Sequence, residues 1–211
     1  MKSLLVFLIL FYALPVFAYD VVEPVFTEQY APASVTSDFY TKTNYLGTLD
    51  GDAQLYEITV PVGDVLPITL QQRANRTPVP FGLLVVEVLG DGEGVREVAR
   101  QNVPPEEWTR VKDARLGLTL LQSPTLEVAL TPGTYQIEVS TPDNIGPYAL
   151  SLGVDDLSPG YFATIGAVRK TQAHFGYSIF RLLISSYVYW PLGIVMFLYA
   201  FYKLYRVSIK L

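Results

Sequence analysis

A run of 21 residues near the C-terminus contains no charged side chain, and it constrains this chain more than any other feature. The run extends from Leu182 to Tyr202 and has the sequence LLISSYVYWPLGIVMFLYAFY. As an α-helix it would be about 31 Å long, which matches the hydrocarbon core of a bilayer. We therefore expect one transmembrane helix over residues 182–202, followed by a short basic cytoplasmic tail over residues 203–211.

The N-terminus indicates export. Lys2 precedes an apolar stretch from Leu4 to Phe17, and Ala18 offers a small residue at a cleavage position. This layout predicts a signal peptide over residues 1–18, with an uncleaved signal anchor as the alternative. In both cases the following domain is exported. The expected arrangement is a single-pass protein of the cell (inner) membrane, with its domain on the periplasmic or extracellular side.

Charge divides the chain into two parts. All 20 acidic residues lie between Asp20 and Asp156, together with only eight basic residues, whereas no acid follows Leu157. Such an acidic domain argues against nucleic acid as a partner, because phosphates require clusters of Lys and Arg. The basic remainder suits the anionic headgroups of the lipid bilayer or acidic surfaces on a partner. The residues expected at the membrane interface are Arg169, Lys170, Arg181, Trp190, Lys203 and Arg206.

The exported part has an apolar period of two. In residues 56–60, for example, Tyr56, Ile58 and Val60 alternate with Glu57 and Thr59. This alternation is typical of strands with one buried face, and Gly, Pro, Asp and Asn clusters separate the runs. We predict a mainly β fold, an antiparallel jelly-roll-like β-sandwich over residues 45–156, preceded by an extended segment over residues 19–44.

Three segments of this domain resemble a known family. They are GTLDGDAQLYEITVPVG at residues 47–63, TPGTYQIEV at residues 131–139 and GPYALSL at residues 146–152. Over residues 45–154 the chain resembles the bacterial pre-peptidase C-terminal domain. The resemblance implies a binding or accessory module rather than a catalyst. Some relatives bind calcium, but Gln54 stands here where the family often has an acid.

Few residues suit catalysis or metal binding. The chain has no cysteine, and its only histidine is His174. Nucleophilic hydrolase arrangements therefore lack a base in the exported domain, although a carboxylate pair like that of glycosidases stays open. Asp50 and Asp52 share a turn and are weak metal candidates, because two acids do not complete a calcium shell. We expect no enzyme activity and no cofactor.

An amphipathic helix is predicted over residues 158–181, with Ser158 as its N-cap. It could lie in the headgroups, pack on its own domain or dock on another subunit, and Gly176 is the expected bend. Its apolar face would contain Phe162, Ile165, Val168, Phe175 and Ile179, and its polar face Arg169, Lys170 and Gln172.

Small residues recur in the transmembrane run at a spacing of seven: Ser186, Gly193 and Ala200. A stripe of this kind lets a second helix approach closely, so it predicts packing against another integral membrane protein or self-association. Two functional hypotheses follow. The first is a non-catalytic accessory or assembly subunit that docks through its stem and head. The alternative is a tethered module whose sandwich loops capture a soluble glycan or peptide.

Overall fold

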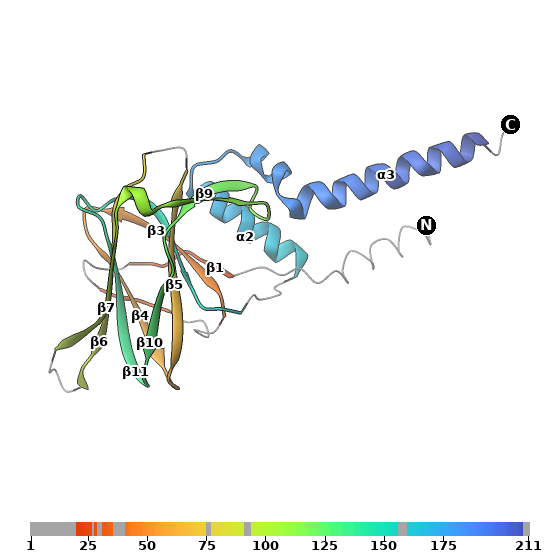
Figure 1. Ribbon diagram of the computed structural model, residues 1–211. Coiled ribbons are helices and arrows are strands. Elements are labelled where there is room, and N and C mark those ends of the chain that lie inside the picture. The colour runs from red at the N-terminus through yellow and green to blue at the C-terminus, as the bar shows by residue number, and fades with distance from the viewer. Residues whose placement is uncertain are drawn as a thin grey trace.

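The computed structural model describes residues 20–26, 28, 31–35, 41–74, 77–90, 94–155 and 160–208. The predicted signal peptide and the predicted N-cap Ser158 lie outside these residues. Alternation between buried and exposed positions runs through most of the strands, as in β4 (Gln54–Val60). The strands form two sheets that pack face to face, and the helices lie beyond one of them (Figure 1).

The first sheet has seven strands and carries the helices on its outer face. Its strands pair antiparallel except at one edge, where the first strand runs parallel to its neighbour. In spatial order they are β1 (Asp20–Val22), β3 (Thr43–Asp50), β12 (Ile145–Leu152), β5 (Asp64–Arg73), β9 (Leu118–Gln122) and β8 (Thr109–Asp113), while β10 (Leu126–Leu130) also pairs with β5.

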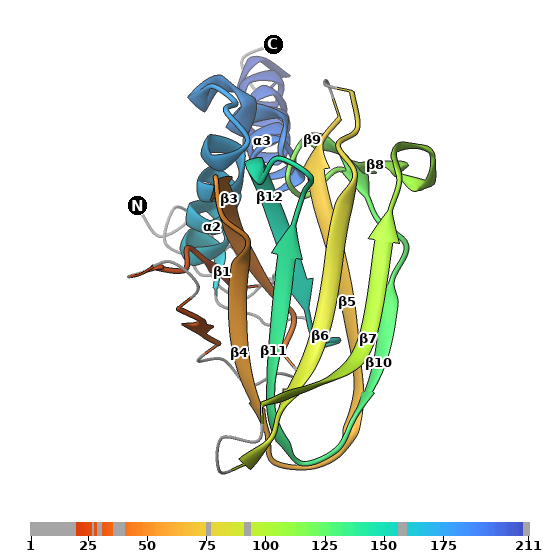
Figure 2. The same cartoon turned by 90° about the vertical axis from the view of Figure 1, so that its left-hand side faces the viewer.

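The second sheet has five strands and faces away from the helices (Figure 2). A short 3-10 helix, η2 (Pro105–Glu107), follows its last strand. In spatial order the strands are β2 (Ala33–Ser34), β4, β11 (Gly133–Ser140), β6 (Phe81–Val88) and β7 (Val95–Val103). The predicted β-sandwich is therefore confirmed. It also includes β1 and β2, both from the stretch expected to be an extended lead-in.

The main core lies between the two sheets and is rich in tyrosine. The hydroxyls of Tyr56 and Tyr148 lie 2.7 Å apart, and Tyr148 donates to Gln54 Oε1 at 2.6 Å. Because burial removes solvent from these phenols, it raises the pKa of both Tyr56 and Tyr148. Gln54, the residue at which the chain departs from the resembling family, thus closes a buried hydrogen-bond chain.

The stem after the sandwich differs from its prediction. Instead of one helix over residues 158–181, it has α2 (Tyr161–His174) and the 3-10 helix η3 (Ile179–Ile184). The break falls at Gly176, where φ is 72° and a residue with a side chain would be strained, so the expected bend is confirmed. The last helix, α3 (Ser186–Ser208), begins four residues later than the predicted span, because Leu182 to Ile184 belong to η3.

Burial along the stem confirms part of the predicted amphipathic pattern and corrects the rest. Val168 and Phe175, both placed on the apolar face, are buried. Phe162 and Ile179, both placed on the apolar face, are 71% and 61% exposed. Gln172, placed on the polar face, is fully buried. The helix packs on its own sandwich through Thr164, Val168, Thr171 and Gln172. Of the three placements left open, packing on the protein's own domain is the one observed.

Among the residues that the structure describes, α3 is the helix long and apolar enough to cross a membrane, over Ser186–Arg206. None of its most apolar window is buried within the chain, and it projects away from the sandwich (Figure 1). Pro191 lies inside the helix.

Candidate functional site

The turn between β8 and β9 joins the sandwich to the stem. Four successive carbonyl groups of this turn, from Ala114 to Gly117, each accept a hydrogen bond from the stem. Gln172 Nε2 donates to Leu116 O at 2.7 Å, and Arg181 Nε donates to Gly117 O at 2.8 Å. Ser185 Oγ donates to Arg115 O, and Ser186 N donates to Ala114 O at 2.9 Å. We call this set of contacts the stem clamp.

The turn is shaped for this role by Asp113. Its Oδ1 accepts hydrogen bonds from the backbone N–H groups of Arg115 at 2.8 Å and Leu116 at 3.1 Å. A carboxylate that holds the amides of the next residues in this way fixes a tight turn. With two of its amides bound by Asp113, the turn presents its carbonyls to the stem.

Apolar packing lies beneath the clamp. A second cluster of buried side chains joins the outer face of the first sheet to α2 and the segment after it, and Tyr177 lies at its margin. The Tyr177 ring also lies under the Arg73 guanidinium, whose Cζ is 4.5 Å from the ring centroid. The buried members of the cluster are Val21, Leu46, Leu116, Leu118, Leu120, Ala149, Val168 and Phe175.

His174 strengthens the same contact. Its Nε2 lies 2.9 Å from the carbonyl oxygen of Tyr148 in β12, so the neutral ring carries its hydrogen on Nε2 and donates a hydrogen bond to that oxygen. Burial lowers the pKa of His174 below its usual value, although this hydrogen bond opposes the shift. The neutral ring is therefore the form that suits the folded junction.

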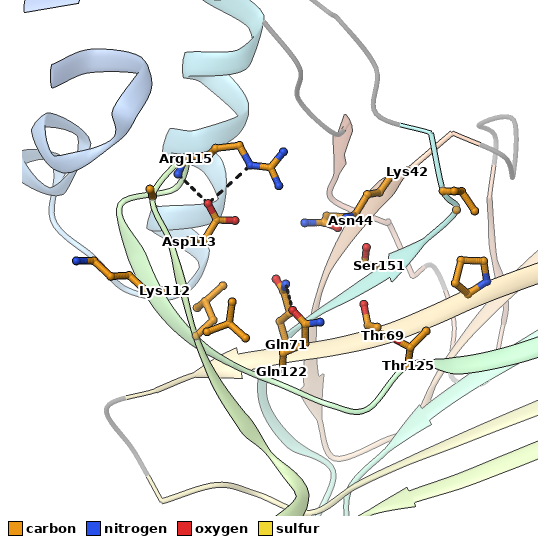
Figure 3. Close-up of a pocket in the computed structure, with 16 residues that line it drawn as sticks. Lys42, Asn44, Thr69, Gln71, Lys112, Asp113, Arg115, Gln122, Thr125 and Ser151 are labelled. Atoms are coloured by element: carbon orange, nitrogen blue, oxygen red, sulfur yellow. Dashed lines mark hydrogen bonds and ion pairs between the residues drawn. The ribbon is translucent and has the colours of Figure 1, made fainter. Parts of the chain in front are cut away.

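A polar groove lies beside the clamp on the same outer face of the first sheet (Figure 3). Its volume is about 570 Å³, within the range of ordinary small-ligand sites. The floor follows the strand register: Asn44 pairs with Ser151, and Ser151 pairs with Thr69, across three neighbouring strands. One step along, Gln71 pairs with Gln122, and their side-chain amides are 3.4 Å apart.

The outer face of this sheet is thus divided in two. On β3, Asn44 and Leu46 point to the same side because side chains alternate along a strand, and the same holds for Ala149 and Ser151 on β12. Leu46 and Ala149 are covered by the stem, whereas Asn44 and Ser151 form the groove floor. Two of the turn residues whose carbonyls the clamp binds, Ala114 and Arg115, also line the groove.

Two floor amides have unused hydrogen-bonding atoms. Asn44 is only 2% exposed, and its Oδ1 has no hydrogen-bond partner among the described residues. The same is true of Gln71 Oε1. A buried polar atom without a partner costs free energy, so a water molecule or a polar ligand that donates to these two oxygens would stabilise the groove.

The two weak metal candidates, Asp50 and Asp52, are not joined by further ligating side chains in the part of the chain that the structure describes. Among the residues that the structure describes, no group of three or more His, Cys, Asp or Glu side chains could hold a metal ion. Asp50 ends β3, and the following Gly51 N–H donates to Asn144 O at 2.8 Å. Asp50 and Asp52 therefore flank a turn that the backbone itself closes.

The predicted membrane-interface residues separate into two groups. Arg181 is engaged in the stem clamp, and Arg169 Nη1 donates to Tyr177 O at 3.1 Å, so both stabilise the stem. Lys170 is exposed on α2. Trp190, Lys203 and Arg206 are exposed on α3, where the Arg206 guanidinium lies 5.2 Å from the Tyr202 ring centroid.

The small residues Ser186, Gly193 and Ala200 also separate into one that contacts the sandwich and two that lie on the exposed part of α3. Ser186 is held by the clamp, whereas a Cβ built on Gly193 would meet no described atom within 4 Å, and Ala200 is exposed. Neither the clamp nor the groove was predicted from the sequence. Thr69 and Gln71 are polar residues at alternate positions of one strand, which is the local signal of a polar sheet face. The rest depends on the strand register.

Comparison with known proteins gives structural neighbours only. No family model and no curated protein matches the chain. The pre-peptidase C-terminal domain of a collagenase from Bacillus anthracis is 16% identical, with a TM-score of 0.33, over 53% of this chain and 87% of that one. The Yersinia pseudotuberculosis-derived mitogen is also 16% identical, with a TM-score of 0.34, over 56% of this chain and 95% of its own. A member of the family that the sequence resembles is thus among these neighbours.

Proposed function

We propose that this protein is a non-catalytic, membrane-anchored accessory or assembly subunit that docks on another membrane protein through its stem and head. The stem clamp is the observation that carries the proposal. A simple tether needs only a hydrophobic anchor and a flexible linker. Here four side-chain and backbone donors of the stem bind four successive carbonyls of the sandwich, directly before the helix that could span the membrane.

The proposed placement puts the sandwich outside the cell membrane. α3 would span the bilayer from Ser186, and its C-terminal end with Lys203 and Arg206 would face the cytoplasm. The signal-like N-terminus supports this orientation. Because the clamp ends at Ser186, the sandwich would be held close to the outer membrane surface with little freedom to reorient.

Within the membrane, Gly193 and Ala200 are the proposed contact points for the partner. Both are small and lie on the exposed length of α3, seven residues apart. Small residues at this spacing allow two helix backbones to approach closely, where packing and hydrogen bonds hold membrane helices together.

The test is affinity purification of the full-length protein from its host membranes in a mild detergent, with quantitative mass spectrometry. Gly193→Leu should lower recovery of the co-purifying membrane protein severalfold, because the larger side chain separates the two helices. Val195→Leu adds bulk two residues away on the same helix and should leave recovery unchanged. Recovery of the chain alone, from wild type as from the variants, would overturn the proposal.

Capture of a soluble ligand is the second candidate function. The polar groove favours it, because two unpartnered amide oxygens lie in a cavity of ligand size beside the clamp. The ligand site would then be the face of a sheet rather than the loops of the sandwich.

A further inference from the structure

The groove floor is a row of hydrogen-bonding side chains without an aromatic member. Asn44, Ser151 and Thr69 lie side by side on three adjacent strands, and Gln71 and Gln122 form the next row. Figure 3 shows the polar ends of Asn44, Gln71, Ser151 and Thr69 directed toward the same open space. Both amide and hydroxyl groups are present, so the floor can donate and accept along its length.

The unpartnered amides specify the kind of group that would fit. The Oδ1 of Asn44 and the Oε1 of Gln71 both need donors. If the Asn44 amide were turned by 180°, or those of Gln71 and Gln122 together, an NH2 group would instead need an acceptor. A hydroxyl group serves both cases, because it donates and accepts. A ligand with many hydroxyl groups therefore satisfies this floor whichever way the amides point.

The rim of the groove is cationic in an otherwise acidic domain. Lys42, Lys112 and Arg115 line it, and Asp113 is the one acid among the lining residues. Asp113 is already bound to the Arg115 side chain and to two backbone amides. Lys42 and Lys112 form no ion pair with any residue that the structure describes. An anionic group on the ligand would find two uncompensated ammonium groups here.

A peptide fits the groove less well than a sugar chain. The floor strands β12 and β5 lie inside the sheet, so the floor itself offers no free backbone edge for an extended peptide to join as a new strand, and only the edge strand β8 at the border of the groove does. The apolar lining includes Pro67, Val111 and Val154, beside the polar floor. These surfaces suit the C–H faces of sugar rings, whose hydroxyls would reach the floor.

We propose that this groove binds an acidic oligosaccharide, with its hydroxyl groups on the Asn44–Ser151–Thr69 row and its anionic groups on Lys42 and Lys112. The site goes beyond the proposed accessory role and requires no membrane partner. Arg115 belongs both to the groove and to the turn that the stem clamp holds, so a bound glycan would lie at a fixed height above the membrane.

The experiment measures binding of defined hexasaccharides to full-length protein in a neutral detergent by isothermal titration calorimetry. The acidic probes are oligomers of galacturonate, mannuronate and chondroitin sulfate. Maltohexaose is the neutral control and hexaglutamate is the peptide control. We expect at least one acidic hexasaccharide to bind, and its affinity to fall roughly tenfold between about 20 mM and 500 mM salt, because salt screens the rim charges.

Two sets of variants separate the rim from the floor. The double variant Lys42→Gln, Lys112→Gln should weaken binding roughly tenfold, through the loss of two charge-assisted contacts. Thr69→Val with Ser151→Ala should weaken it roughly fivefold while keeping the shape of the floor, because two hydroxyls are lost. Lys170→Gln removes an exposed charge from α2, outside the groove, and should leave affinity unchanged.

Each other outcome counts against the proposal. Binding of none of the acidic hexasaccharides would overturn it, and so would equal binding of maltohexaose. Equal binding of hexaglutamate would assign the groove to acidic peptides instead. Unchanged affinity in both variant sets, with each variant folded by circular dichroism, would place the ligand elsewhere. None of these results bears on co-purification of a membrane partner, so the two proposals can fail separately.

Discussion

At the scale of single residues, Gly117 decides how closely the stem can approach the sandwich. Its φ is 64°, and a Cβ there would lie 2.8 Å from Ser185 N and 2.9 Å from Ile184 C. We expect Gly117→Ala to lower the free energy of unfolding by about 2 kcal/mol, because an L residue in this conformation costs about 1–2 kcal/mol before the clash is counted. Displacement of the stem should also speed trypsin cleavage after Arg181 in the full-length protein.

Gly94→Ala is the matched control for this prediction. Gly94 also has a positive φ, 95°, but a Cβ there would meet no described atom within 4 Å. Gly94→Ala should therefore lower the free energy of unfolding through backbone strain alone, and the rate of trypsin cleavage after Arg181 should stay unchanged. If Gly117→Ala were cleaved there no faster than wild type, the stem would not depend on this contact.

At the scale of elements, η3 presents an apolar surface directly before α3, the helix that could span a membrane. Ile179, Phe180, Leu183 and Ile184 are 51–76% exposed, and Phe180 is the most exposed of them. Exposed apolar side chains beside a membrane span gain free energy when they enter the interface. We predict that η3 lies in the outer interface of the bilayer while Arg181, on the same element, holds the sandwich.

Single cysteine labelling tests the position of η3, since the natural chain contains no cysteine. A solvent-sensitive fluorophore on Phe180→Cys in nanodiscs should emit at a shorter wavelength and be shielded from aqueous iodide. The same label on Val95→Cys, an exposed position of β7, should be quenched freely. Equal quenching at the two positions would show that η3 stays in water.

Prediction from the sequence worked for elements whose burial follows a simple period. The strands around Ile58 and Ile137 alternate between the core and the other face, so their pattern predicted them. It was only partly right for the stem, where Val168 and Phe175 are buried as predicted. Thr164 and Thr171 are also buried, with their hydroxyls bonded to Gly160 O and Ala167 O, and Gln172 is buried with its amide bonded to Leu116 O. Polar groups that find partners can be buried, and periodicity assigns them to the surface.

The groove and the clamp were not predicted from the sequence, and the reason is different from that for α2. Asn44, Thr69 and Ser151 are far apart in the sequence and meet only through the register of three strands. The clamp likewise joins Gly117 to Arg181, 64 residues later. Neither the strand register nor the partner of a turn carbonyl can be predicted from local composition, since both depend on how distant segments pair in the folded sandwich.

At the scale of the whole molecule, several kinds of contact connect the sandwich to the proposed membrane anchor. Hydrogen bonds of the clamp, the apolar cluster around Val168 and Phe175, and the Arg73–Tyr177 stack all join the sandwich to the segment before α3. The apolar cluster excludes water, while the hydrogen bonds fix one orientation. A sandwich attached in this way can present its groove or its surface to a partner in a defined orientation relative to α3.

The last prediction concerns this rigidity. Spin labels on Ile145→Cys in the sandwich and Met196→Cys in α3, both exposed, should give a narrow distance distribution in nanodiscs by double electron–electron resonance. Adding Arg181→Gln and Ser185→Ala removes two clamp hydrogen bonds, at about 1 kcal/mol each, and should widen the distribution. Ser178→Ala, an exposed change in the same stem, should leave it narrow. A broad distribution already in the otherwise unchanged chain would mean that the sandwich moves freely on its anchor, and the clamp could not then orient it.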